Sequence, residues 1–159
     1  MTILCCCSDH IGTGEKPKKV TYELVKKWGE SFDELLSHVT GRRAFTAFLK
    51  SEYSDENILF WNACEELKKE KNPEKIEEKA RIIYEDFISI LSSKEVSLDA
   101  TVREAVNENM KNPTSESFNA AQKQIYTLMQ RDSYPRFVAS SNYREIRNSF
   151  GIIEEEVDI

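Results

Sequence analysis

The chain has 159 residues, of which 40% are hydrophobic and 31% charged, and its formal net charge is −6. This length suits one ordinary domain, the acidic balance excludes nucleic acid as an expected partner, and no apolar run approaches the roughly 20 residues that a membrane-spanning helix needs. With only five Gly and four Pro, a sandwich of short strands is disfavoured.

The first 20 residues differ from the rest. They read MTILCCCSDHIGTGEKPKKV, with no sustained helical period, and we expect a flexible tail there. No secretory signal is visible. Three adjacent cysteines, Cys5, Cys6 and Cys7, plus the distant Cys64 do not make a disulfide framework, which indicates a reducing intracellular setting.

The clustered cysteines of this tail favour S-acylation, because cysteines beside a basic segment are the usual acceptors of reversible palmitoylation. Residues 15–27 hold five Lys against two Glu. Lysines and acyl chains together would hold the tail at an anionic membrane, with about 1 kcal/mol from each lysine at most. An unmodified tail is the alternative. The cysteines and His10 lack the spacing of a structural zinc site, so we expect no metal.

From about residue 22 onward, apolar residues recur at spacings of three and four, which predicts helices almost everywhere. The expected faces are Leu24, Val25 and Trp28; Phe32, Leu35, Leu36 and Val39; Phe45, Phe48 and Leu49; Ile58 to Trp61; Ala80, Ile83, Tyr84, Phe87 and Leu91; Val102, Ala105, Val106 and Met110; and Phe118, Ala121, Ile125, Leu128 and Met129. No segment alternates with period two. These patterns predict one all-α bundle of eight or nine helices.

Several residues predict where helices begin and end. We expect Ser31, Ser54 and Asp99 to act as N-caps, Gly41 to end a helix, and the helix from Ser54 to reach about Lys71. Asn72 followed by Pro73 is a strong start signal.

Near the end of the chain, Pro135 predicts the start of a new short helix. A last helix is expected around residues 142–150. The acidic segment 148–159 ends in EVDI, which fits a strand-addition peptide for a PDZ groove.

The helix after Ser54 opens its apolar face with an amide, since Asn57 shares the face of Phe60, Trp61 and Cys64. We expect Trp61 to be largely buried and Cys64 to act as a small buried hydrophobe.

Catalysis by this chain is poorly supported. Neither His10 nor His38 sits in a motif that couples it to a nucleophile, and both are interpreted as surface residues. Neither a Walker-type nor a dinucleotide-binding glycine loop exists, so no cofactor is expected.

The segments FLKSEYSDENILFW, KARIIYEDFIS, KEVSLD and IYTLMQRDSYPRF closely resemble the RGS domain, the regulator of G-protein signalling module. The similarity covers about residues 28–147. YEDFISIL, KEVSLD and the clustered cysteines look most like the GAIP or Rz subgroup, which carries an N-terminal cysteine string.

The resemblance implies a nine-helix domain of two sub-bundles that accelerates GTP hydrolysis by Gα subunits, mostly of the Gi, Go and Gz type, without being an enzyme itself. The acylated, basic tail would place the protein on the inner face of the plasma membrane. Carried over position by position, the residues that grip Gα in its GTP or transition-state form would be Tyr53, Ser54, Glu56, Asn57, Glu95, Ser97, Asp99, Leu128, Asp132, Ser133 and Arg136.

One of these positions departs from the common pattern of the family. Many members carry Asn where this chain has Ser97, and the shorter serine puts direct contact with the Gα glutamine in doubt. A scaffold with this fold but no activity, a helical adaptor and an enzyme remain as alternatives. Retention of Glu56, Asn57, Asp132 and Arg136 argues against the scaffold.

Overall fold

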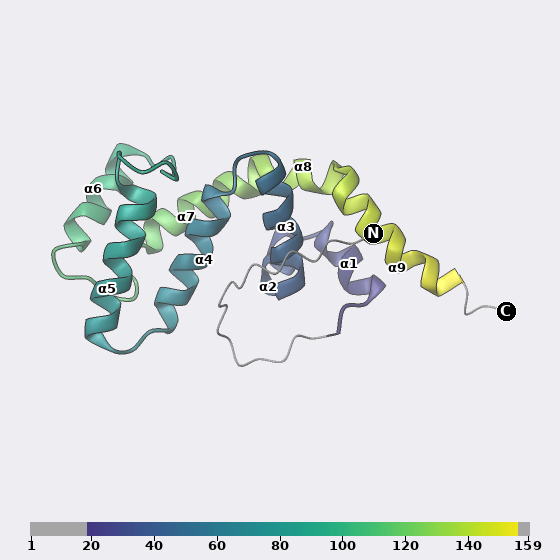
Figure 1. The fold of residues 1–159 in the computed structure, drawn as a ribbon, viewed down its shortest axis with the longest axis horizontal. Helices are drawn as coiled ribbons and strands as arrows, with labels where there is room; N and C mark the ends of the chain where they lie inside the picture. Colours follow the sequence, from purple (N-terminus) through teal and green to yellow (C-terminus); the bar gives the residue numbers. More distant parts are fainter. Residues whose placement is uncertain (1–18, 156–159) are drawn as a thin grey trace.

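The computed structural model describes residues 19–155, which form nine α-helices and no strand (Figure 1). The helices are α1 (Tyr22–Trp28), α2 (Phe32–Ser37), α3 (Val39–Ser51), α4 (Glu56–Lys69), α5 (Pro73–Ile83), α6 (Ala100–Asn109), α7 (Asn119–Leu128), α8 (Tyr134–Ala139) and α9 (Ser141–Glu155). Two π-helical turns, η1 (Tyr84–Ile88) and η2 (Met129–Ser133), extend α5 and join α7 to α8.

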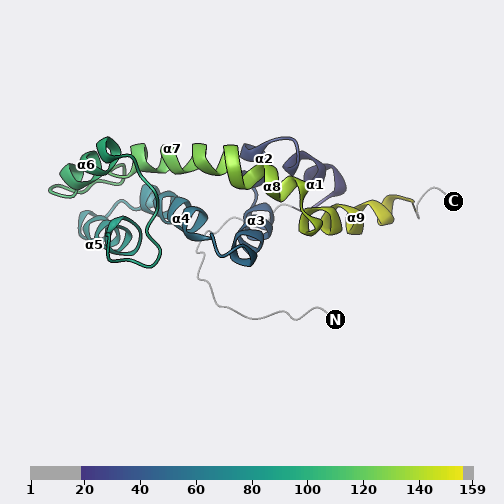
Figure 2. The ribbon, with the colours of Figure 1, turned by 90° about the horizontal axis from the view of Figure 1, so that it is seen from above.

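The helices form two sub-bundles side by side along the long axis of the molecule (Figures 1 and 2). The α4–α7 sub-bundle contains α4, α5, α6 and α7; the α3–α8 sub-bundle contains α1, α2, α3, α8 and α9. Helical turns from α7 through η2 to α8 run from one sub-bundle into the other, as Figure 2 shows. The predicted all-α fold of two sub-bundles is confirmed.

Local signals set several helix starts as the sequence predicted. The Ser31 hydroxyl accepts a hydrogen bond from the Glu34 N–H at 3.3 Å. The Asn72 side chain accepts from the Glu74 N–H at 3.0 Å, with Pro73 in the first turn. These bonds satisfy backbone donors that have no partner inside the helix.

Aromatic side chains build the core of the α3–α8 sub-bundle. The ring of Phe137 from α8 lies 5.6 Å from Phe45 of α3 and 5.3 Å from Tyr143 of α9. The Tyr143 hydroxyl donates to the Val25 carbonyl at 2.7 Å, and Trp28 is fully buried. Helices from the two ends of the sequence are thereby packed against α3.

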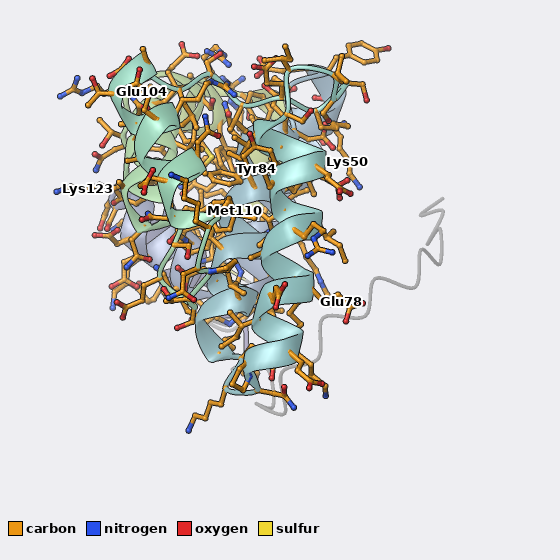
Figure 3. All side chains as sticks on the ribbon, turned by 90° about the vertical axis from the view of Figure 1, so that its left-hand side faces the viewer. Lys50, Glu78, Tyr84, Glu104, Met110 and Lys123 are labelled. Atoms are coloured by element: carbon orange, nitrogen blue, oxygen red, sulfur yellow. The ribbon has the colours of Figure 1, made fainter. Side chains whose placement is uncertain are left out.

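The α4–α7 sub-bundle has its own core around Phe60, which contacts the rings of Phe87 and Phe118. A buried amide joins α7 to α4, because Gln122 Nε2 donates to Glu65 Oε1 at 2.7 Å and to the Trp61 carbonyl at 3.2 Å. In Figure 3, Tyr84 and Met110 lie between the helices of this sub-bundle, whereas Glu78, Glu104 and Lys123 lie at its periphery.

Gly41 does not end a helix as predicted. It lies inside α3, where an added Cβ would stand 2.4 Å from the Leu35 carbonyl oxygen. The absence of a side chain allows α3 to pack closely on α2 and does not end the helix. His38 is also not a surface residue: it is buried and caps α3, with its Nδ1 accepting from the Thr40 N–H at 3.1 Å.

Two other positions correct the predicted apolar faces. Leu91 is 92% exposed because the π-helical turn η1 ends the helix before it. Ala105 is exposed on α6. Trp61 packs against the core and is less completely covered than Phe60 before it on the same helix. α9 also continues to Glu155, beyond the predicted end at Phe150.

Cys64 is buried in the core, as predicted. Burial raises the pKa of its thiol to about 12, against a smaller lowering by Lys68. Because the thiolate is the nucleophilic form, this cysteine is unreactive at neutral pH.

Candidate functional site

Three connections between helices contain all the residues predicted to face a partner. They are the α3–α4 connection (residues 52–55) with the first turn of α4, the η1–α6 connection (residues 89–99), and the stretch from Leu128 through η2 to Arg136. The first two lie along the upper edge of the molecule in Figure 1, as does the junction of α7 and α8. Segments far apart in sequence therefore meet at one edge.

The α3–α4 connection turns sharply at Tyr53, a non-glycine residue with φ of 57°. The Tyr53 N–H donates to the Lys50 carbonyl at 3.1 Å and the Ser54 N–H to the Leu49 carbonyl at 3.0 Å. This is a Schellman ending, in which glycine usually takes the left-handed position. The Tyr53 side chain is 95% exposed, so no contact within the described chain explains its choice.

Ser54 does not cap α4, which corrects the prediction. The N-cap position belongs to Asp55, whose side chain makes no capping bond either. The Ser54 hydroxyl oxygen is buried and has no hydrogen-bond partner within the described residues. The Asp55 carboxylate is turned instead toward Lys94, whose Nζ lies 2.7 Å from Asp55 Oδ1.

Glu56 and Asn57 form the first turn of α4, and both are partly exposed. Asn57 lies beside the buried Ile58 and three residues before the buried Phe60, which fix the backbone that carries it. Within the described part of the chain, no hydrogen bond engages the Asn57 amide. A partly exposed amide on a packed helix end is available for an external partner.

The η1–α6 connection is held by Arg103 of α6. Its Nη2 lies 2.8 Å from Glu95 Oε1, and its Nη1 donates to the Ile88 carbonyl. The Val96 side chain is buried and its N–H donates to the Phe87 carbonyl at 2.9 Å. Ser97, next in sequence, is exposed.

Asp99 closes this connection at the start of α6. Its backbone N–H donates to Gln124 Oε1 of α7 at 3.0 Å, while its exposed side chain makes no capping bond. The predicted N-cap position is confirmed, but the predicted capping role is not. The carboxylate faces solvent, two residues after the exposed Ser97.

Arg136 of α8 organises the third stretch. Its Nη1 lies 2.6 Å from Asp132 Oδ1, and its Nη2 and Nε bind the two carboxylate oxygens of Glu52 at 3.0 and 3.2 Å. Hydrogen bonds to Glu52 and then Asp132 raise the pKa of this guanidinium. Leu128 is 38% exposed, whereas Ser133 is buried and presents little surface to a partner.

The α3–α4 connection is thus bound to both other segments, through Glu52 to Arg136 and through Asp55 to Lys94. Glu52, Asp55, Lys94 and Arg103 were absent from the predicted set. Each pairs with a residue that lies eight or more positions away in sequence, and no local pattern reveals such a pair.

The model of the Regulator of G protein signaling domain family matches residues 31–146, most of the chain. This chain is an RGS domain protein. It is 67% identical over 137 residues to Regulator of G-protein signaling rgs-2 of Caenorhabditis elegans, covering 86% of this chain and 81% of that protein. The match to human Regulator of G-protein signaling 20 is 58% over 137 residues, covering 86% of this chain but 35% of that protein.

Human Regulator of G-protein signaling 19 is also 58% identical, over 124 residues that cover 78% of this chain and 57% of that protein. The matches to regulators 19 and 20 confirm the predicted GAIP or Rz subgroup. The match to this chain spans most of the nematode relative and about a third of the human regulator 20.

Several predictions for this RGS protein fall on residues that the structure does not describe. Cys5, Cys6 and Cys7 lie before residue 19, and the EVDI segment occupies residues 156–159. Among residues 19–155, no helix is long and apolar enough to cross a bilayer. Over the same range, no cluster of His, Cys, Asp and Glu could hold a metal ion.

Proposed function

We propose that this protein accelerates GTP hydrolysis by Gα subunits of the Gi, Go and Gz type, and so ends G-protein signalling. The observation that carries the proposal is the edge where three connections meet. Ion pairs join these segments there, and among residues 19–155 no hydrogen bond engages the Asn57 side chain. Membership of the RGS family supports Gα as the partner.

The proposed mechanism is positioning. Gα supplies its own nucleotide site and an arginine for the transition-state charge, so the regulator need only hold mobile switch loops in the hydrolytic arrangement. An acceleration of roughly 100-fold requires about 2.7 kcal/mol of extra affinity for the transition state. Tyr53, Glu56 and Asn57 on one connection, with Asp132 and Arg136 on another, would provide contacts on both sides of a switch segment.

Ser97 would contribute less than Asn57. Its side chain is short and exposed, and the loop that carries it is fixed by the buried Val96. A hydroxyl at this position reaches less far than the amide that many family members carry. The accelerating effect would therefore rest mainly on the α4 end of the site.

Affinity for three states of Gα tests the proposal. Purified Gα of each type would be loaded with GDP, with GDP and fluoroaluminate, or with a stable GTP analogue, and titrated with this protein. We expect the tightest binding to the fluoroaluminate state, together with acceleration in single-turnover hydrolysis. Equal affinity for the three states, or no acceleration with any Gα, would refute the proposal.

We also infer that acyl groups on Cys5, Cys6 and Cys7 hold the protein at the cytoplasmic face of the plasma membrane. The adjacent lysines Lys16, Lys18, Lys19, Lys26 and Lys27 support this, because one acyl chain alone binds a bilayer only marginally. Replacing the three cysteines with Ser should move the protein to the soluble fraction and leave hydrolysis in solution unchanged. Unchanged membrane fractionation would refute acylation.

A further inference from the structure

The Asp55 carboxylate occupies the N-cap position of α4 without capping it. An aspartate there ordinarily accepts a backbone N–H and stabilises the helix. Here Asp55 Oδ1 lies 2.7 Å from Nζ of Lys94, 39 residues further along the chain, and the two side chains are 11% and 47% exposed. The local stabilising bond has been replaced by a long-range one.

The two segments joined by this pair are each fixed internally. The α3–α4 connection is closed by the hydrogen bonds of Tyr53 and Ser54 to the last turn of α3. In the η1–α6 connection, the Lys94 N–H donates to Ser92 Oγ at 3.1 Å and the Val96 N–H to the Phe87 carbonyl at 2.9 Å. Hydrogen bonds within each segment fix its shape, so the position of one segment relative to the other can vary more than the shape of either.

Between these segments, residues 52–57 and 84–99, the Asp55–Lys94 pair is the one hydrogen bond or ion pair that the described chain shows. Packing of Phe60 on Phe87 fixes the segments deeper in the sub-bundle. The ion pair joins them two residues before Asn57 on one segment and three residues before Ser97 on the other.

We propose that Asp55 and Lys94 are positioning residues, which set the distance between the start of α4 and the η1–α6 connection on the Gα-facing edge. The proposal rests on the proposed function and adds a requirement to it: neither residue belongs to the set predicted to grip Gα. Because the Lys94 side chain is 47% exposed, solvent screens its attraction to the buried Asp55 and limits the contribution of the pair to global stability. The main effect of the pair would therefore fall on the geometry of the site.

Substitutions that keep the shape of the side chains test this role. Asp55→Asn and Lys94→Met each remove one charge, and Lys94→Arg keeps it. We expect the concentration for half-maximal acceleration of GTP hydrolysis to rise about fivefold in each of the first two variants. Lys94→Arg should remain near wild type. The thermal midpoint should change little in all three.

The double variant Asp55→Asn with Lys94→Met distinguishes positioning from direct contact. If the residues act only through each other, the double variant loses no more than either single one. Additive losses would overturn the proposal. So would a loss in Lys94→Met beside wild-type behaviour in Asp55→Asn, which would mean that Lys94 itself touches the partner.

Lys79→Met is the matched control, because the Lys79–Glu70 pair is equally short at 2.8 Å and belongs to the opposite end of α4. It should leave acceleration unchanged; a loss equal to that of Lys94→Met would assign the effect to surface charge and overturn the proposal.

A readout without Gα separates this proposal from the proposed function. Amide hydrogen exchange of the free protein should be several-fold faster at Val96 in Asp55→Asn and Lys94→Met, and unchanged in Lys79→Met. Unchanged exchange at Val96 would overturn the positioning role. If wild type fails to accelerate any Gα, the proposed function fails whatever the exchange shows.

Discussion

At its C-terminal end α4 leads into α5 through residues 70–72, and at its N-terminal end it follows α3 through residues 52–55. At the α5 end, Asn72 caps the next helix, Pro73 follows it, and Glu70 accepts from both the Lys71 and Asn72 N–H groups. At the α3 end, a tyrosine takes the left-handed position and an aspartate leaves its helix uncapped. A serine hydroxyl is buried there with no partner among the residues that the structure describes.

The α4–α5 connection follows the local preferences that stabilise helices, whereas the α3–α4 connection departs from them. Residues that satisfy nearby backbone groups stabilise both the turn and the helix after it, as at Asn72. Departures from these local preferences cost stability, and they are expected at functional sites. In this molecule three such departures, at Tyr53, Ser54 and Asp55, lie at the end of α4 where the candidate site lies.

The same substitution at the two ends of α4 should have opposite consequences. Asn57→Ala should reduce the acceleration of GTP hydrolysis about 5- to 150-fold, because an unpaired partner group at an interface costs about 1–3 kcal/mol. Asn72→Ala should leave acceleration unchanged and lower the free energy of unfolding by about 1 kcal/mol through loss of the cap. Single-turnover hydrolysis and urea unfolding measure the two effects.

If Asn57→Ala instead kept full acceleration, the amide would be no more than a helix-start residue and the comparison of the two ends would lose its functional meaning. A large loss of stability in Asn57→Ala would have the same consequence.

Tyr53→Gly should stabilise the protein while weakening its activity. The left-handed conformation costs a non-glycine residue roughly 1–2 kcal/mol, and the larger entropy of glycine in the unfolded chain offsets part of the gain. We expect a net rise of about 0.5–1 kcal/mol in the free energy of unfolding, measured in urea.

Tyr53→Ala is the control for this prediction, because it removes the exposed ring and keeps the strain. Both variants should lose affinity for the fluoroaluminate state of Gα, and only the glycine variant should gain stability. Equal stability of the two would mean that the backbone at Tyr53 is not strained.

The smallest effect is expected from Ser54→Ala. Removing a buried hydroxyl that has no partner in the described part of the chain should leave the free energy of unfolding unchanged or raise it by about 0.5 kcal/mol. Ser31→Ala, at the serine that does cap its helix, should lower it by about 1 kcal/mol. Thermal and urea unfolding of both variants would measure this difference. An equal loss of stability in Ser54→Ala and Ser31→Ala would contradict the prediction.

Sequence patterns correctly predicted those helix starts that depend only on residues nearby in the sequence. Ser31, Asn72 and Pro73 act within one turn of their own position, and they mark helix starts as expected. The prediction that Ser54 caps α4 was wrong because Asp55 occupies the N-cap position, and its carboxylate pairs with Lys94, 39 residues away in sequence. The prediction that Gly41 ends a helix was wrong because this glycine instead allows the Leu35 carbonyl to pack closely against α3.

The site divides in the same way. Resemblance placed Asn57 and Arg136 on the candidate surface, since their segments match the family pattern. It did not reveal that Glu52, Asp55 and Arg103 hold that surface together, because ion pairs between distant segments form only after the helices pack. Trp61 shows the same limit, since helical periodicity gives its face but not how far neighbouring helices cover it.

The hydrogen bond from Tyr143 to the Val25 carbonyl spans 118 residues, and it affects the order in which the molecule can form. The α4–α7 sub-bundle uses one uninterrupted stretch, residues 56–128, so a ribosome can release everything this unit needs before α8 is made. The other unit is split, with α1–α3 synthesised early and α8 and α9 late. During synthesis, Trp28 and Phe45 therefore keep apolar surface exposed until Phe137 and Tyr143 have been made. The interval between synthesis of α3 and synthesis of α9 is the period in which aggregation and chaperone binding are most favoured.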